Sequence, residues 1–282
     1  MEFVKMHGLG NDFVIVDARK SPYLEHKDWE EVAIKVCDRH YGIGADGLIL
    51  VLPSEIADIS WRIINPDGSE PEMCGNGIRC FARYVYERAI VTNKIIKVET
   101  LAGIIVPEIQ VNDEGKVVAV KVDMGEPIFE RSKIPMTGHA DKVIDEEIDV
   151  NGNTVKITAL SMGNPHCLIY VDKIDQAPLT EWGPLVEKHQ IFPKKTNVEF
   201  VEILNRNEAH MRVWERGAGP TLACGTGACA TLVGSVLNGY LDRQATIHLP
   251  GGDLEIEWDE GSNKVFMTGP AVEVFQGNYP LE

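Results

Sequence analysis

Two cysteines flanked by glycine are the residues of this chain best suited to do chemistry. Cys74 and Cys224 lie 150 residues apart (224 − 74), and segments 74–77 and 224–227 both have the pattern Cys-Gly-Xaa-Gly. An apolar, helix-like stretch follows each segment. A thiol in the first turn of a helix lies beside free backbone N–H groups and the positive end of the helix dipole, which favour the thiolate. We therefore expect two acid–base thiols, each with a lowered pKa.

Two such thiols suit the inversion of a carbon centre. If the two halves face each other, one thiolate removes a proton from one face while the opposing thiol delivers a proton to the other. Converging helix N-termini would also bind a carboxylate between them. The alternative is that both cysteines only pack. Asn65 and Glu215, each nine residues ahead of its cysteine (74 − 65, 224 − 215), favour the chemical interpretation.

The cysteine segments belong to a longer internal repeat. Arg62 and Arg212 are also 150 residues apart (212 − 62), and so are Gly47 and Asn197 (197 − 47). The segment beginning at Asn11 resembles the one beginning at Asn164, at a separation of 153 (164 − 11). Four matched segments in the same order indicate a duplication, with chance similarity among strands as the alternative.

Each half is expected to be a strand meander wrapped on one apolar helix. The helices are predicted at 75–89 and 225–237, with a peripheral helix at 29–37. Strands are predicted at 95–99, 104–109 and 117–122, and again at 245–249, 254–258 and 265–267. A helix without a polar face must be covered by sheet, which predicts an α+β fold.

The composition limits the partners and the compartment. In 282 residues, 27 Lys and Arg stand against 43 Asp and Glu, a formal charge of −16, which argues against nucleic acid or an anionic membrane as partner. No apolar stretch of about 18 residues is present. The chain starts with a strand-like segment rather than a secretion signal, so we expect a cytoplasmic protein with reduced thiols.

The remaining cysteines are expected to be structural. The gaps Cys74-x5-Cys80 and Cys224-x4-Cys229 do not match the pairs of zinc sites, so no metal is expected. Four cysteines have apolar or helical neighbours and are predicted to be buried: Cys37, Cys80, Cys167 and Cys229.

Several polar candidates also have a structural interpretation. His166 could be a satisfied core histidine. Asn11, Asn164 and Asn197 could bond backbone in turns. The dipeptide at 215–216 could be a surface ion pair.

Taken together, the motifs closely resemble diaminopimelate epimerase. They run in order from Lys5 to about Gln276 and comprise Gly8–Phe13, Asn65–Gly68, Met73–Cys80, Gly163–His166, Glu215–Gly217 and Ala223–Gly227. The resemblance implies two pseudo-symmetric domains, each a mostly antiparallel sheet rolled around a central helix, with the active site in the cleft between them. The implied domains are 1–124 with the C-terminal strand 267–282, and 125–266.

The resemblance also implies an activity and its residues. LL- and meso-diaminopimelate would be interconverted for lysine and peptidoglycan synthesis, without a cofactor, by a homodimer. Cys74 and Cys224 would exchange protons, and His166 and Glu215 would tune or orient them. The reacting carboxylate would be bound by Gly75, Asn76, Gly225 and Thr226. The distal end of the substrate would be fixed by Asn11, Asn65, Asn164, Asn197 and Arg216, with Glu215 taking the distal ammonium group.

One position departs from the family pattern, and two other functions stay open. Some members carry Gln at the position of Gly47, where no side chain can make that contact here. Proline and hydroxyproline racemases also use two cysteines, but they typically have His where this chain has Asn76. A redox or binding protein with a disulfide between Cys74 and Cys224 is the alternative from another class.

Overall fold

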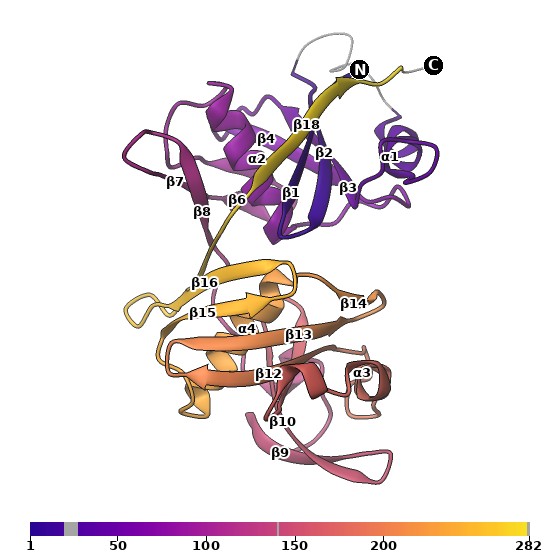
Figure 1. The fold of residues 1–282 in the computed structure, drawn as a ribbon, viewed down its shortest axis with the longest axis vertical. Coiled ribbons are helices and arrows are strands. Elements are labelled where there is room, and N and C mark those ends of the chain that lie inside the picture. The colour runs from indigo at the N-terminus through magenta and orange to yellow at the C-terminus, as the bar shows by residue number, and fades with distance from the viewer. Residues whose placement is uncertain (20–27, 140, 281–282) are drawn as a thin grey trace. The chain divides into compact units, whose positions relative to one another are not determined.

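The computed structural model describes residues 1–19, 28–139 and 141–280, in two compact units. Unit 1 comprises Met1–Asp123 with Thr268–Glu282, and unit 2 comprises Met124–Met267. Residues 281–282, the end of the predicted segment 267–282, lie outside the described residues. In Figure 1 the yellow C-terminal strand lies along the indigo N-terminal strand, so unit 1 contains both ends of the chain.

The sheet of unit 1 has seven strands in the order β18-β1-β2-β3-β4-β5-β6. They are β18 (Val272–Asn278), β1 (Glu2–Gly8), β2 (Asn11–Asp17), β3 (Gly47–Leu52), β4 (Ile59–Ile64), β5 (Val98–Thr100) and β6 (Gly103–Ile105). The unit also contains α1 (Trp29–Cys37), α2 (Gly75–Glu87) and a hairpin of β7 (Glu108–Val111) and β8 (Val117–Asp123).

The strands of unit 2 follow the order β17-β16-β15-β13-β12-β11-β10-β9, and β14 pairs with β13. They are β9 (Val143–Val150), β10 (Asn153–Ser161), β11 (Pro165–Tyr170), β12 (Asn197–Asn205), β13 (Glu208–Glu215), β14 (Gly219–Thr221), β15 (Gln244–Leu249), β16 (Gly252–Trp258) and β17 (Val265–Gly269). The helices are α3 (Leu179–Glu187) and α4 (Gly225–Leu237), with short 3-10 turns η2 (Arg131–Lys133) and η3 (Ile174–Gln176).

Strand pairing shows the pseudo-symmetry directly. From β1 to β6 the successive pairs are antiparallel, parallel, antiparallel, parallel and antiparallel, and the same sequence of orientations runs from β10 to β16. Equivalent residues pair in the same register: Phe13 with Gly47 and His166 with Asn197, Leu48 with Ile64 and Val198 with Trp214. The predicted α+β fold of two pseudo-symmetric domains is confirmed.

The expectation of simple meanders was wrong, because each unit contains two parallel pairs. Parallel neighbours need a crossover connection, and helices supply it. In unit 1, α1 joins β2 to β3 and α2 joins β4 to β5. In unit 2, α3 joins β11 to β12 and α4 lies between β13 and β15. The sequence analysis did not predict α3, which contains Gly183 and Pro184.

The two central helices form where they were predicted and are buried. Helix α4 spans the predicted 225–237, and its residues from Gly227 to Ser235 are all buried. Helix α2 starts at the predicted Gly75 but ends at Glu87, two residues early, because Ala89 adopts a positive φ of 51°. The peripheral helix matches its prediction. No helix in the described parts of the chain is long and apolar enough to cross a lipid bilayer.

The predicted strand 104–109 is in fact two strands in different sheets, β6 and β7. Pro107 lies between them, and proline has no N–H to donate to a ladder. The predicted strand 95–99 begins only at Val98, since Ile95 forms a single bridge with Glu108. The other predicted strands are present with ends shifted by up to two residues.

Candidate active site

In unit 1, Cys74 is the N-cap residue of α2. Its backbone is extended, and its Sγ accepts a hydrogen bond of 3.4 Å from the N–H of Gly77. The thiol is half-buried and its Sγ lies 3.9 Å from Oδ1 of Asn11. The same oxygen accepts a bond of 3.1 Å from Nδ2 of Asn76. Three predicted site residues therefore meet at this helix start.

The Asn11 side chain is held by a carboxylate that sequence reasoning missed. Asn11 follows Gly10, whose φ of 86° makes the tight turn between β1 and β2. Its Nδ2 donates to Oδ2 of Asp46 at 2.7 Å, and Asp46 is paired with Arg39 at 2.7 Å. This contact turns the Asn11 oxygen toward Cys74.

Asn76 and Asn65 have different hydrogen-bond partners. Buried Arg79 holds the Asn76 oxygen at 3.0 Å and the Gly75 carbonyl at 3.2 Å. Asn65 instead bonds Ser69 Oγ at 2.9 Å within the turn after β4. The structure therefore joins Asn76 to the cysteine cluster and leaves Asn65 in its own turn.

In unit 2, Cys224 caps α4 in the same way. Its Sγ accepts from the Gly227 N–H at 3.4 Å and lies 3.6 Å from the Thr226 hydroxyl. Unlike Cys74, it is buried, with 6% of its surface exposed.

A chain of hydrogen bonds leads from Thr226 into the core. Nδ2 of Asn164 donates to the Thr226 hydroxyl at 3.2 Å, and Oδ1 of Asn164 lies 3.0 Å from Nε2 of His166. Nδ1 of His166 lies 2.6 Å from Oε1 of Glu199, and both side chains are completely buried. His166 is thus a satisfied core histidine and is also connected to the cysteine. Glu199, which sequence reasoning missed, lies on β12 two residues after the matched Asn197.

Glu215 completes this group from the end of β13. Its carboxylate accepts a bond from Thr221 and lies close enough to Cys224 for the two groups to interact electrostatically. Burial raises the pKa of Glu215, the nearby Glu199 raises it further, and the hydrogen bond from Thr221 opposes the shift. Glu215 is therefore no surface ion-pair residue.

The expected lowering of both thiol pKa values is wrong for Cys224. Burial raises the pKa of its thiol well above the ordinary value, and Glu215 and Glu199 raise it further. The bonds from Thr226 and the Gly227 N–H lower that pKa but are outweighed. Desolvation next to two carboxyl groups exceeds the effect of the helix N-terminus.

Asn197 and Arg216 shape the loop beyond β13. The Asn197 side chain makes two hydrogen bonds to the backbone. Its Nδ2 donates to Pro165 O at 2.8 Å, and its Oδ1 accepts from Arg216 N at 2.9 Å. The Arg216 guanidinium is exposed and reaches Lys194 O at 3.4 Å. Buried Glu187, another residue missed from sequence, accepts from Trp214 Nε1 at 2.9 Å and from Gly217 N at 3.1 Å. Glu187 thus holds the residues on either side of Arg216 in place.

The other cysteines of the chain are structural. All six cysteines are thiols rather than disulfides, and Cys37, Cys80, Cys167 and Cys229 are buried as predicted. Within the described ranges, no three His, Cys, Asp or Glu side chains converge as a metal site would require.

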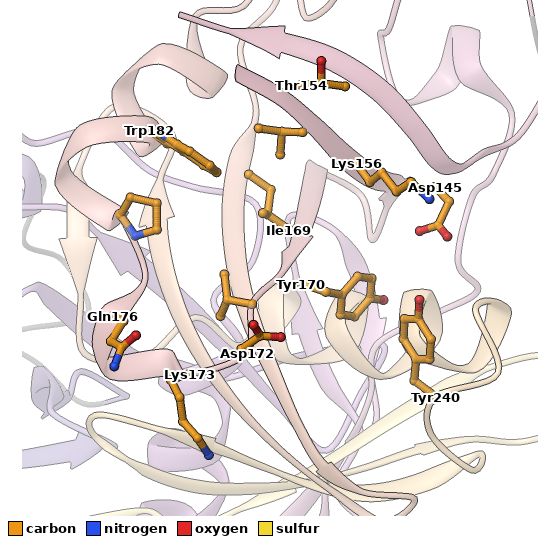
Figure 2. A pocket seen from close by; sticks show the side chains of 13 residues that line it. Asp145, Thr154, Lys156, Ile169, Tyr170, Asp172, Lys173, Gln176, Trp182 and Tyr240 are labelled. Atoms are coloured by element: carbon orange, nitrogen blue, oxygen red, sulfur yellow. The ribbon is translucent and has the colours of Figure 1, made fainter. Parts of the chain in front are cut away.

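A separate hollow of about 520 Å³ lies at the other end of β11 from His166. Figure 2 shows Trp182 on one side of it and the Tyr170 and Tyr240 rings on the other, with Asp145 and Lys156 above the tyrosines. The two tyrosine rings meet edge to face at 4.8 Å. None of the predicted site residues lines this hollow.

Comparison with known proteins gives one consistent family. The chain matches the diaminopimelate epimerase family model over residues 3–130 and 158–274. It is 66% identical over 281 residues to the diaminopimelate epimerase of Heliobacterium modesticaldum, covering 100% of both chains. It is 58% identical over 284 residues to that of Moorella thermoacetica, again covering 100% of both.

Solved structures share the fold at low identity. A Bacillus anthracis phenazine biosynthesis protein of the PhzF family matches with a TM-score of 0.72 and 20% identity, covering 100% of this chain and 99% of the other. A probable proline racemase from Agrobacterium radiobacter matches with a TM-score of 0.69 and 16% identity, covering 100% and 93%. At these identities the likeness establishes the fold alone.

Proposed function

Since this chain belongs to the diaminopimelate epimerase family, we propose that it interconverts LL- and meso-diaminopimelate by proton transfer at one α carbon. The observation that carries the proposal is the repeated cap: Cys74 and Cys224 occupy equivalent helix starts, each with glycine N–H groups and an asparagine network beside it. The reaction needs one group able to accept a proton and another able to donate one, and two thiols supply both.

In the proposed mechanism the Cys74 thiolate removes the α proton while the Cys224 thiol donates one to the opposite face. The raised pKa of Cys224 supports its role as the acid of the free enzyme. After turnover Cys74 carries the proton and Cys224 is the thiolate, so the reverse reaction uses the same groups in exchanged roles. Proton exchange with solvent restores the starting state.

The helix N-termini supply electrostatic stabilisation in this proposal. Residues 75–76 and 225–226 lie in the first turns of α2 and α4, where backbone N–H groups favour a carboxylate. Negative charge grows on that carboxylate as the α proton leaves, so these N–H groups bind the transition state more strongly than the substrate.

The distal amino-acid group is assigned to residues of both half-sites. Exposed Arg216 would bind its carboxylate, and Glu215, beside that arginine, would take its ammonium group. We propose Asn11, Asn65, Asn164 and Asn197 as further contacts. The side chains of Asn164 and Asn197 already make protein bonds, which supports an orienting role for these two.

The decisive experiment follows deuterium from heavy water into LL-diaminopimelate with wild type, Cys74→Ala and Cys224→Ala. We expect wild type to invert the substrate and both variants to lose at least about 10²-fold in rate. Proline and hydroxyproline serve as substrate controls. Turnover of proline instead would identify a racemase, and activity that survives both substitutions would refute the two-thiol mechanism.

We further propose a homodimer in the cytoplasm. Edge strand β18 exposes Val274 (55%) and Phe275 (47%), apolar side chains that a second copy could cover. Six reduced thiols suit a reducing compartment. Sedimentation velocity tests the dimer with Val274→Lys as the disrupting variant, and fractionation of the source cells tests the location. A wild-type monomer at micromolar concentration, or recovery outside the cytoplasm, would overturn the respective claim.

A further inference from the structure

Glu199 is a buried carboxylate that the proposed proton transfer does not itself use. Its side chain has 0% exposed surface, and Oε1 contacts Nδ1 of His166 at 2.6 Å. Its second oxygen, Oε2, has no hydrogen-bond partner among the described residues. Burying such a group is costly, so its presence beside the Cys224 network calls for a reason.

The internal repeat shows that the fold does not need this carboxylate. By the shared register, unit 1 has Phe13 and Ile49 where unit 2 has His166 and Glu199. A Cβ on Gly77 would lie 3.3 Å from the Ile49 methyl, and a Cβ on Gly227 would lie 2.9 Å from Oε1 of Glu199. An apolar pair therefore supports the helix of Cys74, whereas a polar pair supports the helix of Cys224.

The chemistry of the acceptors fixes the direction of the hydrogen bonds. Oδ1 of Asn164 can only accept, so Nε2 of His166 carries a proton. The other amide end of Asn164 donates to the Thr226 hydroxyl. Since Thr226 accepts from Asn164, its own hydrogen is free to point at Sγ of Cys224.

We propose that Glu199 is a positioning residue that, through His166 and Asn164, turns the Thr226 hydroxyl into a hydrogen-bond donor to the thiolate that Cys224 becomes once it has given its proton to the substrate. The Nδ1–Oε1 contact holds one proton, so the His166–Glu199 pair is neutral overall and keeps Nε2 protonated. Unit 1 has the opposite arrangement, because an acceptor, the Asn11 oxygen, faces Cys74 and suits the thiol that Cys74 becomes once it has taken up the substrate's proton. The network thus gives the two otherwise equivalent thiols different environments.

A carboxylate does this better than an amide. Gln at position 199 carries no charge that would hold a second proton on His166. It can accept from Nδ1–H, which leaves Nε2 without a proton, or donate to Nδ1, which keeps the proton on Nε2. In the first state the asparagine amide would turn over and present its oxygen to Thr226, whose hydrogen would no longer reach Cys224, and in the second state the network stays intact. Other groups that face this region are Glu215 from β13 and Cys167 from β11, and neither substitutes for the Nδ1 contact.

The test measures alkylation of each cysteine by iodoacetamide at a fixed pH of about 8, near the thiol range, quantified by peptide mass spectrometry. His166→Phe combined with Glu199→Ile, the pair found in unit 1, removes both hydrogen-bond states and is expected to slow Cys224 alkylation about tenfold, the equivalent of one pKa unit, and to leave Cys74 unchanged. Thr226→Val removes the donor directly and should have the same effect. Adding Thr226→Val to the Phe and Ile substitutions should slow alkylation no further, because both changes remove the same bond.

The control is Glu202→Gln on the same strand, which removes a carboxylate bonded to Lys173 at 2.8 Å and to Ile174 N at 2.8 Å. It should leave both alkylation rates unchanged. Faster Cys224 alkylation in the protein with both His166→Phe and Glu199→Ile would mean that Glu199 acts as a bare negative charge, and an unchanged rate or additive effects would mean that it only packs. Each of these results would overturn the proposal.

The inference rests on the proposed function only for its catalytic consequence, which is that variants without the Glu199 network should have a lower kcat with little change in KM. Alkylation needs no turnover, so a wild type inactive on diaminopimelate would refute the function and leave this test intact. His166→Phe combined with Glu199→Ile transplants the unit 1 pair and should fold with slow Cys224 alkylation. Wild-type Cys224 kinetics in that folded variant would also overturn the proposal.

Discussion

Glu215 is kept in an environment that opposes its own ionisation. Burial raises the pKa of Glu215, with Glu199 adding to the shift, so the carboxyl group is harder to ionise in the folded protein than in water. The sign follows from linkage: stability is lost as pH rises from the ordinary carboxyl value, about 4.3, through the raised folded value. Ionising Glu215 therefore costs stability, and a side chain that cannot ionise would be more stable at this position.

Glu215→Gln should therefore be more stable than wild type at neutral pH. The amide keeps the shape and removes the ionisation, so the gain in melting temperature should be small near pH 4 and larger near pH 8. Epimerase activity should fall about 10²-fold or more, because an uncharged amide cannot pair with the ammonium group assigned to Glu215 and no longer offers Cys224 an acid–base neighbour. Calorimetry at the two pH values checks this, and an equal gain at both would contradict the linkage.

At the scale of single elements, the second glycine after each cysteine has a different neighbour in the two units. A Cβ on Gly227 would lie 2.9 Å from Oε1 of Glu199. A Cβ on Gly77 would instead meet the methyl groups of Ile49 and Ile63, both at 3.3 Å. Methyl groups on flexible side chains can move by a few tenths of an ångström. A carboxylate bonded to a buried histidine cannot move without losing that bond.

Gly227→Ala should therefore destabilise the protein by about 1–3 kcal/mol, the usual cost of overpacking. Gly77→Ala is the matched control and should be nearly neutral, because alanine is a better helix former by about 0.5–1 kcal/mol. Urea unfolding measures both. Equal free energies of unfolding for the two variants would show that Glu199 does not constrain α4.

The elements near the cysteines were the most predictable from sequence, for local reasons. A cysteine followed by Gly-Xaa-Gly and a long apolar run gives both the helix start and the cap, so α4 was predicted to the residue. The parallel pairs and α3 were missed because crossover topology depends on contacts far apart in sequence. Glu199 was missed because it sits within an apolar strand, where only its match to Ile49 in the repeat could have singled it out.

At the scale of the whole molecule, unit 1 is completed by the end of the chain. β18 pairs with β1 along most of its length, and Phe275 packs edge to face on Phe3 at 5.8 Å. The fully buried Arg79, which holds Asn76 beside Cys74, donates to Pro270 O at 3.3 Å. Unit 2, in contrast, is one continuous segment. The surroundings of Cys74 and of Cys224 therefore depend differently on the last residues.

Truncation after Gly269 should loosen unit 1 selectively. β1 would become an unpaired edge and Arg79 would lose a partner, so hydrogen exchange in β1 and α2 should accelerate by at least about 10²-fold, whereas β11 and α4 should keep their protection. Epimerase activity should be lost while the Cys224 network persists, so Cys224 should still be alkylated at the full-length rate. Uniform loss of protection across both units would instead show that they unfold as one, and unchanged exchange in β1 would show that β18 is dispensable.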